Sequence, residues 1–219
     1  MKKTIFVVGA GKGLGNAVAK KFGQNDFKVV LMSRNAENLE NYKAEFDAEG
    51  IEAEILVADA ADAADGRQFA ATLNRAKENY GTPDVLFYNV GITTPDDALS
   101  QGVDAELLMQ RYQIDVAGAY TAVQTIMDDA FVGKKGSILI TGGGLAMYPY
   151  AGFLPLSMDK AALRAMVLAL NPVYKEKGVF IGAVQVCDTI GASEKYMPVN
   201  IAEKFWKLYQ NRSDAEIVY

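Results

Sequence analysis

Short apolar runs alternate with longer segments of helical periodicity along this chain, and the alternation restricts its fold more than any other feature. The apolar runs occupy residues 4–9, 27–33, 51–59, 84–91, 136–144 and 179–186, and the helical patterns occupy 13–24, 35–49, 64–80, 104–130, 156–170 and 201–210. Almost continuously apolar strands separated by helices are typical of a parallel sheet that is covered on both faces. With a possible last strand at 215–219, the pattern predicts an α/β fold: a doubly wound parallel sheet of about seven strands with helices on both faces.

The length and hydrophobicity fit one folded unit with a large core. The chain has 219 residues, of which 50% are hydrophobic, and a chain of this size forms one domain by default. We therefore expect a single domain over 1–219. No run approaches the ~18 consecutive apolar residues of a membrane span, and glycines interrupt the N-terminal apolar segment too early for a signal peptide. We expect a cytoplasmic protein with no membrane partner.

The scarcity of two residue types excludes several chemistries. The chain contains no histidine, which excludes a Ser-His-Asp triad and histidine-ligated zinc, and we expect no metal site. Cys187 is the single cysteine, so an internal disulfide is impossible, and we expect it to be a buried thiol at a strand end. A net charge of −5 without a basic run argues against a nucleic-acid partner. Small molecules or proteins remain as partners.

A glycine-rich turn follows the first apolar run. In "VVGAGKGLG", Gly9, Gly13 and Gly15 have a GxxxGxG spacing, directly before a helical segment. Such glycines allow a tight turn and let a pyrophosphate approach the free N–H groups at a helix N-terminus; the alternative is close packing of a strand on a helix. The position after a first strand favours nucleotide binding. The loop residues that we expect to contact the nucleotide are Gly9, Gly11, Lys12, Gly13, Leu14 and Gly15.

The end of the second apolar run indicates which nucleotide binds. An acidic residue there would hold the ribose 2′-hydroxyl of NAD(H), whereas basic residues accommodate the 2′-phosphate of NADP(H). Ser33 occupies the acidic position, Arg34 follows it, and Lys12 can approach the same phosphate from the glycine loop. Two cations without a carboxylate favour NADP(H) over NAD(H). The alternative is that both cations are solvated surface charges.

Taken together, these motifs resemble the short-chain dehydrogenase/reductase family over nearly the full chain, which implies a Rossmann-like fold. In that family an aspartate after the third strand contacts adenine, and Asp59 in "VADAAD" is similar to it. Asn89 and Gly91 in "YNVG" match the family's NNAG motif, in which Tyr88 is a change. The segment "GSILITGGG" is similar to the strand that ends at the family's catalytic serine, and "MDKAALRAM" to the helix that carries its active-site lysine, here Lys160.

The resemblance also implies that most of the catalytic residues are missing. The family's lysine follows a catalytic tyrosine by four residues, and that position holds Leu156. The family's serine falls on Gly143 or Gly144, and its helix asparagine falls on Asp115. A positioned acid contributes about 10²–10⁴ in rate, so classical carbonyl reduction is poorly supported. Lys160 can still bind the nicotinamide ribose, as it does in the family.

Three other side chains are candidates for the missing acid or base. Tyr148 and Tyr150 precede the lysine helix, where the family places substrate contacts; the alternative is aromatic packing over the cleft. Asp115 has two interpretations, as a carboxylate base or as an ion-pair partner of Lys160, and we favour the ion pair. Ser157 precedes "MDKAAL" and is expected to be a helix N-cap.

The loop after the sixth apolar run departs from the family's proline-glycine pattern. In "VQVCDTIGAS", Thr189 is expected to preserve part of the contact with the nicotinamide amide. Two classes of function remain open: an NADP(H)-dependent oxidoreductase with an altered site, acting on a small carbonyl or alcohol, or a non-catalytic NADP(H)-binding sensor or regulatory module. The family's habits and the apolar run "AALRAMVLAL" also lead us to expect a homodimer or homotetramer.

Overall fold

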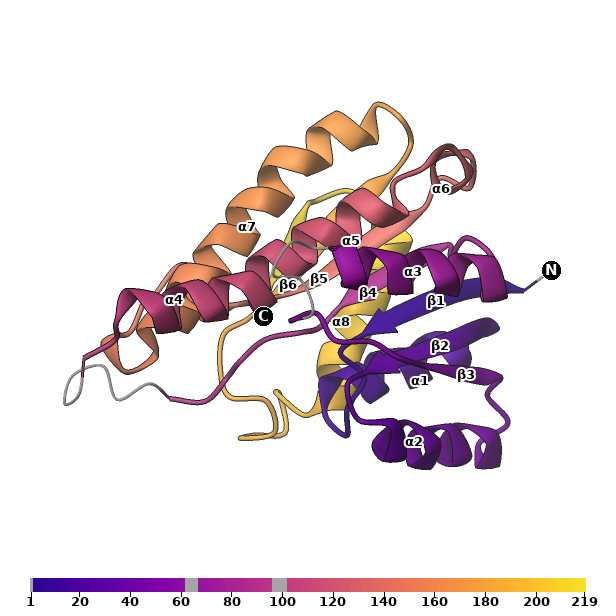
Figure 1. Ribbon diagram of the computed structural model, residues 1–219, viewed down its shortest axis with the longest axis horizontal. Helices are drawn as coiled ribbons and strands as arrows, with labels where there is room; N and C mark the ends of the chain where they lie inside the picture. Colours follow the sequence, from indigo (N-terminus) through magenta and orange to yellow (C-terminus); the bar gives the residue numbers. More distant parts are fainter. Residues whose placement is uncertain (1, 62–66, 96–101) are drawn as a thin grey trace.

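The computed structural model describes residues 2–61, 67–95 and 102–219, in which seven parallel strands form one sheet (Figure 1). The strands are β1 Lys3–Val8, β2 Phe27–Ser33, β3 Ala53–Val57, β4 Val85–Tyr88, β5 Ser137–Gly143, β6 Phe180–Val186 and β7 Glu216–Val218. The helices are α1 Leu14–Gly23, α2 Ala36–Ala48, α3 Arg67–Tyr80, α4 Ala105–Tyr112, α5 Gly118–Ile126, α6 Asp129–Gly133, α7 Leu154–Lys175 and α8 Pro198–Asn211. The predicted doubly wound α/β fold is confirmed.

Both faces of the sheet are covered because successive strand residues point to opposite sides. Along β1, Ile5 and Val7 belong to one buried cluster and Phe6 and Val8 to the other. Helices α1, α2 and α8 cover the first face, and α3, α5 and α7 cover the second (Figure 1). Burial on both sides explains why the strands are almost continuously apolar.

The order of the strands places a crevice at the carboxyl end of the sheet. The order is β3-β2-β1-β4-β5-β6-β7, so the chain leaves β1 toward β2 on one side and returns to β4 on the other. Val8 at the end of β1 pairs with Met32 of β2 and Tyr88 of β4. Ligands of open α/β sheets bind at such a switch point.

The chain is continuously helical over 105–126, so the helix expected over 104–130 is present but ends four residues early. Between α4 and α5 the chain forms a π-helical segment, Gln113–Ala117, in which Asp115 accepts a hydrogen bond from the backbone N–H of Ile92. After α5 the chain turns, and the Asp128 side chain caps the separate start of α6. Single-turn π segments are frequent at functional sites.

The helix expected over 156–170 is longer than predicted and spans Leu154–Lys175. It continues past Pro172 because its last turns pack on β6, where the backbone N–H of Ile181 donates to the Asn171 side chain over 3.3 Å. Neither this helix nor any other in the described segments is long and apolar enough to cross a membrane.

Candidate functional site

The glycine turn after β1 accepts no side chain at two positions. Gly9 has φ +92°, and a Cβ atom there would lie 2.8 Å from the backbone carbon of Asn89. A Cβ atom on Gly15 would lie 2.4 Å from the Gly9 carbonyl oxygen. Both contacts are closer than any real Cβ atom makes with backbone, so the turn requires glycine at both positions.

The remainder of the loop presents an open helix N-terminus. Gly11 and Gly13 have no atom within 4 Å of the position of an added Cβ atom. Gly13 precedes α1, and no side chain caps its first turn. The loop is fixed from behind, because the Gly11 N–H donates to the Asn16 side chain over 3.0 Å. Lys12 is exposed above the loop. This arrangement suits an anionic group resting against backbone N–H groups.

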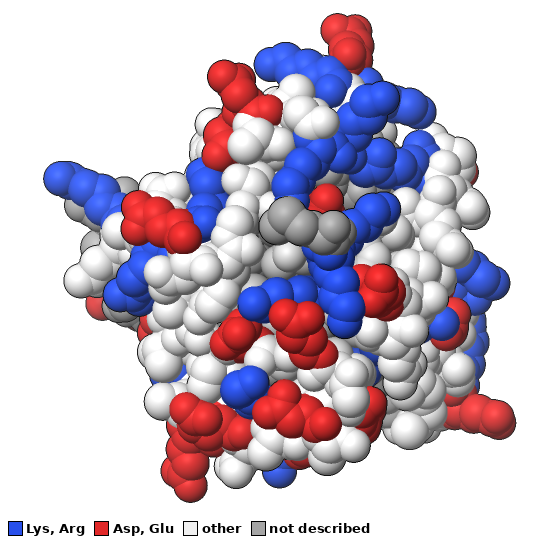
Figure 2. All heavy atoms as spheres, turned by 90° about the vertical axis from the view of Figure 1, so that its right-hand side faces the viewer, with Lys and Arg blue, Asp and Glu red and all other residues white. Residues whose placement is uncertain are grey.

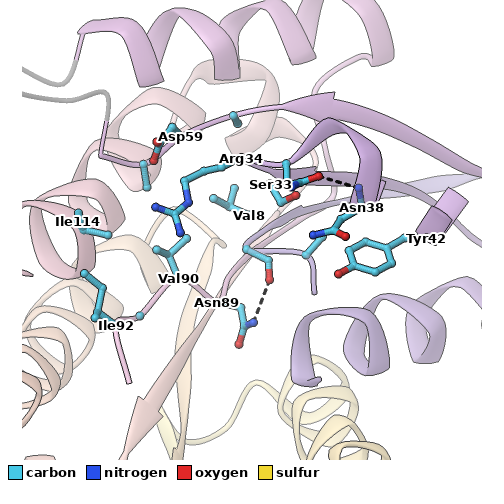
Figure 3. Close-up of a pocket in the computed structure, with 16 residues that line it drawn as sticks. Val8, Ser33, Arg34, Asn38, Tyr42, Asp59, Asn89, Val90, Ile92 and Ile114 are labelled. Carbon is cyan, nitrogen blue, oxygen red and sulfur yellow. Dashed lines mark hydrogen bonds between the residues drawn. The ribbon is translucent and has the colours of Figure 1, made fainter. Parts of the chain in front are cut away.

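A cavity of about 310 Å³ lies beside this loop, at the carboxyl ends of β1, β2 and β4. It brings together six of the predicted binding residues: Gly9, Ser33, Arg34, Asp59, Asn89 and Gly91. The Arg34 side chain extends across the cavity toward Asp59 and Val90 (Figure 3). Among the described residues that line it, Asp59 is the only carboxylate.

Asn89 connects the strands that border the cavity. Its side-chain Nδ2 donates to the Gly9 carbonyl over 3.0 Å (Figure 3), and its Oδ1 accepts from the Thr141 hydroxyl over 2.8 Å. The amide therefore holds the end of β1 against β5. Thr141 was not singled out in the sequence, although it stands in the quoted "GSILITGGG" segment.

Lys160 lies beside Gly91, which lines the cavity, and only 6% of its surface is exposed. Its ammonium donates to the Thr141 carbonyl over 2.9 Å. Burial lowers the pKa of Lys160, and the attraction of Asp115 and Asp159 opposes this shift. The α7 helix thus places a buried cation beside Gly91.

The side chains of Asp115 and Lys160 both approach Gly91. An added Cβ atom on Gly91 would lie 3.4 Å from Lys160 Nζ and 3.7 Å from Asp115 Oδ2. Burial raises the pKa of Asp115, and Lys160, the N–H of Ile92 and Arg111 oppose that shift. The two opposite charges attract each other across Gly91, while the direct hydrogen bond of Lys160 goes to Thr141.

The positions of the family's tyrosine and serine hold leucine and glycine, which have no hydroxyl group. Leu156, one helical turn before Lys160, is buried with 6% of its surface exposed. A Cβ atom on Gly143 would lie 3.3 Å from Lys160 Cγ, whereas one on Gly144 would lie 2.9 Å from the backbone Cα of Cys187. Gly143 is therefore the position from which a side chain would meet Lys160.

The proposed tyrosine substitutes lie on the surface. Tyr148 is 75% exposed and Tyr150 is 60% exposed, and the Tyr150 ring packs at 6.3 Å from that of Phe153. Ser157 is not the N-cap that we expected, because α7 begins at Leu154. Instead its buried hydroxyl donates back to the Phe153 carbonyl over 2.8 Å and accepts from the Tyr150 N–H over 3.2 Å. The serine therefore fixes the loop that carries Tyr150.

The loop after β6 is exposed, which corrects one prediction. Cys187 is exposed rather than buried, because β6 ends at Val186 and the chain leaves the sheet there. Thr189 is also exposed, and its N–H donates to the Asp188 side chain over 2.7 Å. Neither residue lines the cavity beside the glycine loop.

Arg111 was not singled out in the sequence, and Tyr88 was noted only as a change within a motif. Arg111 is buried, and its guanidinium donates to the Ile92 carbonyl and the Thr94 hydroxyl. Tyr88 donates to the Ile114 carbonyl over 2.7 Å, and burial, with Asp115 and Asp59, raises its pKa well above the usual value. A charged residue inside an amphipathic helix was the only available signal for Arg111.

Within the described segments, no three His, Cys, Asp or Glu side chains are grouped to hold a metal ion.

Comparison with known proteins places this geometry in a family. The family model for short chain dehydrogenases matches residues 3–195. The human "Inactive hydroxysteroid dehydrogenase-like protein 1" is 27% identical over 80% of this chain and 52% of its own length. The "NADPH-dependent reductase BacG" of Bacillus subtilis (strain 168) is 29% identical over 74% of this chain and 61% of its own. The chain thus spans only about half to three fifths of the length of these relatives.

A solved structure shares the fold. A metagenomic short-chain oxidoreductase in complex with NADP is 22% identical, with a TM-score of 0.85 over 99% of this chain and 95% of that one. At this identity the likeness concerns the fold alone. With the family match over most of the sequence, the chain belongs to the short-chain dehydrogenase family.

Proposed function

We propose that this chain binds NADP(H) and does not catalyse the tyrosine-dependent carbonyl reduction typical of its family. One observation carries the proposal: the side chain one helical turn before the buried Lys160 is Leu156, itself buried. Leucine has no proton to transfer, and Gly143 has no hydroxyl to hold a substrate oxygen. The word "inactive" in the name of the human relative and the "NADPH-dependent" of the bacterial one agree with the two halves of the proposal.

The residues of the crevice fit a nicotinamide dinucleotide. The open N-terminus of α1 at Gly13 suits its pyrophosphate. Arg34, extended into the cavity, offers the charge that a 2′-phosphate needs, and Ser33 replaces the carboxylate that would repel it. Asp59 lines the same cavity, where it is expected to contact the adenine. When bound, the nicotinamide ring supplies a hydride donor or acceptor.

In this proposal Lys160 binds the nucleotide and takes no part in proton transfer. Its position is fixed by the Thr141 carbonyl, and the nearby Asp115 and Asp159 favour its charged form. With no phenol beside it to activate, the ammonium is available to donate to a ribose hydroxyl. A protein that retains the nucleotide contacts without the proton donor is suited to sensing or sequestering NADP(H).

Arg34→Ala tests the cofactor assignment. We expect the affinity for NADPH to fall about 10-fold, because an exposed charge-assisted hydrogen bond is lost, and the affinity for NADH to change less than about 2-fold. Nucleotide fluorescence titrations of both proteins measure this. Arg75→Ala removes the same charge from the exposed side of α3 and is the matched control. Equal binding of NADPH and NADH, unchanged in Arg34→Ala, would show the assignment to be wrong.

A second candidate, an oxidoreductase with a relocated acid, is favoured by one observation. Asp115 is fully buried beside Lys160, and burial raises its pKa. A carboxyl group that retains its proton at higher pH can act as a general acid. In this alternative Asp115, Tyr148 or Tyr150 supplies the proton to a small carbonyl substrate.

Asp115→Asn tests whether the carboxyl group carries that proton. Because the folded pKa lies above the ordinary 3.8, Asp115 adds stability at pH values below 3.8 that is lost as the pH rises through the folded pKa. The unfolding free energy of the wild type relative to Asp115→Asn should therefore fall with rising pH, by at most about 1.4 kcal/mol per pH unit. Urea denaturation across this range measures the difference, and a flat difference would contradict the raised pKa.

We also propose that the chain forms a homo-oligomer and is located in the cytoplasm. Apolar side chains are exposed on the helices of one face: Met109 and Tyr112 on α4, Tyr120 on α5, and Leu168 and Val173 on α7. These support a homodimer or homotetramer, which light scattering would detect. The single cysteine suits a cytoplasmic protein, and the net charge of −5 favours small molecules over nucleic acid as partners.

A further inference from the structure

A second cleft opens at the opposite end of the sheet, where the strands begin. It has a volume of about 260 Å³, and its lining residues are Lys3, Asp84, Lys134, Lys135, Tyr209, Gln210 and Arg212. Figure 2 views the molecule from this side and shows Lys and Arg side chains gathered in the upper half of the face. Since β1 runs from this cleft to the glycine turn, the nucleotide cavity lies at the other end of the same strand.

The charges of this basic cleft do not balance. Among the described residues that line it, Asp84 is the only carboxylate, and it is already paired with the ammonium of Lys134 over 3.2 Å while accepting the N–H of Thr4 over 2.9 Å. Within the described part of the chain, Lys3, Lys135 and Arg212 have no carboxylate within 4.0 Å. Three uncompensated cations therefore line one cleft of a chain whose net charge is −5.

Arg212 is held rigidly in the wall of the cleft. Its guanidinium donates to the carbonyls of Lys135 and Gly136 and to the Ser137 hydroxyl. These partners are neutral, so they fix the side chain without cancelling its charge. Burial lowers the pKa of Arg212, which reflects the cost of holding this cation without an anion.

The remaining lining groups supply further donors. The Lys3 ammonium donates to the Tyr209 hydroxyl oxygen over 2.9 Å, which leaves the hydroxyl hydrogen free to turn toward the cleft. The Gln210 amide and the exposed Lys135 ammonium lie on the same lining. A cleft with ammonium, guanidinium, phenol and amide donors is suited to oxygen anions.

The backbone around the cleft is unusual. Three non-glycine residues in the described segments have positive φ, and two of them line this cleft: Lys135 at +52° and Arg212 at +51°. Side chains other than glycine, asparagine and aspartate are uncommon in this region. Both residues stand at helix ends, where a left-handed residue is common: Arg212 caps α8, and Lys135 follows the C-cap of α6.

We propose that the basic cleft binds a compact multivalent anion of the phosphate class, at a site separate from the nucleotide cavity. Three uncompensated positive charges suit a diphosphate, and they exceed the charge of about −2 that a phosphate monoester carries at pH 7. The small volume and the negative net charge of the chain favour a small anion over a polyanionic surface. The ligand can be a free inorganic anion or a phosphate carried on a small molecule.

The test is a titration of the ¹⁵N-labelled chain with inorganic pyrophosphate at constant ionic strength, followed by amide chemical shifts and by calorimetry. We expect the largest shifts at Lys135, Gly136 and Gln210. Lys135→Asn combined with Lys3→Gln should weaken binding at least about 10-fold, and asparagine tolerates the positive φ at position 135. Lys207→Ala removes an exposed lysine of α8 that lies outside the cleft and should bind like the wild type.

Pyrophosphate can also reach the glycine loop, and two observations separate the sites. Arg34→Ala should leave the shifts at Lys135 unchanged, and so should saturation with NADPH. Tighter binding of pyrophosphate than of glycerol 3-phosphate assigns a free anion, and the reverse order assigns a phosphate ester. The proposal is overturned if neither anion binds above chloride, if shifts are confined to the glycine loop, or if Lys207→Ala weakens binding as much as the cleft variant.

Discussion

Leu156→Tyr combined with Gly143→Ser is expected to raise NADPH-dependent carbonyl reduction by about 10²–10⁴-fold over the wild type. The new phenol would stand one helical turn before Lys160, whose buried ammonium favours the ionised phenol. The new serine would meet the Lys160 stem, where a Cβ atom lies 3.3 Å from Cγ, and this flexible stem can shift by the few tenths of an ångström required. Steady-state rates against a panel of small carbonyl compounds measure the gain.

The control variant is Leu156→Phe combined with Gly143→Ser, which brings the same ring without its hydroxyl. It should remain as inactive as the wild type, because the ring alone transfers no proton. Equal rates for the tyrosine and phenylalanine variants would mean that the missing phenol does not limit activity. A wild type already as active as the tyrosine variant would contradict the proposed function itself.

Gly15→Ala is expected to abolish nucleotide binding and to destabilise the fold by about 1–3 kcal/mol. The added Cβ atom would lie 2.4 Å from the Gly9 carbonyl oxygen and 3.1 Å from the Ala10 Cα. Both atoms belong to the backbone of the turn, so relief requires moving α1 away from β1. Thermal or urea unfolding measures the loss of stability, and fluorescence titration with NADPH measures binding.

Gly13→Ala separates packing from ligand contact, because no atom lies within 4 Å of its added Cβ atom. This variant should change the free energy of unfolding by less than about 0.5 kcal/mol. It should still lower the affinity for NADPH, because the methyl group would occupy the space above the helix N-terminus. Equal losses of stability in the two glycine variants would refute the packing argument. Full NADPH affinity in Gly13→Ala would show that the pyrophosphate does not lie there.

The fold could be predicted because its signals are local in sequence. Each strand is a short apolar run, and alternating residues such as Phe6 and Val7 enter the two different cores. The residues that line the cavity could be named for a related reason: the glycine turn and the end of β2 are compact motifs whose positions follow from a parallel sheet. Ser33, Arg34 and Asp59 lie at one cavity, and their contact with NADP(H) stays a prediction.

The features that were missed depend on contacts between distant segments. The π-helical segment at Asp115 accompanies a bond to Ile92, 23 residues earlier, and periodicity in the helix carries no record of it. The exposure of Cys187 depends on where β6 leaves the sheet. The basic cleft joins Lys3, Asp84, Lys135 and Arg212, which no sequence window contains together.

The central claim is that the nucleotide half of the site remains while the chemical half is lost. The most direct test titrates the purified wild-type chain with NADPH and then follows the nicotinamide absorbance of the bound nucleotide after adding a panel of carbonyl compounds. We predict saturable binding, tighter than that of NADH, with no oxidation above the rate in protein-free buffer. Oxidation of bound NADPH that disappears in Asp115→Asn, Tyr148→Phe or Tyr150→Phe would contradict the claim and assign the proton to the residue whose loss stops it.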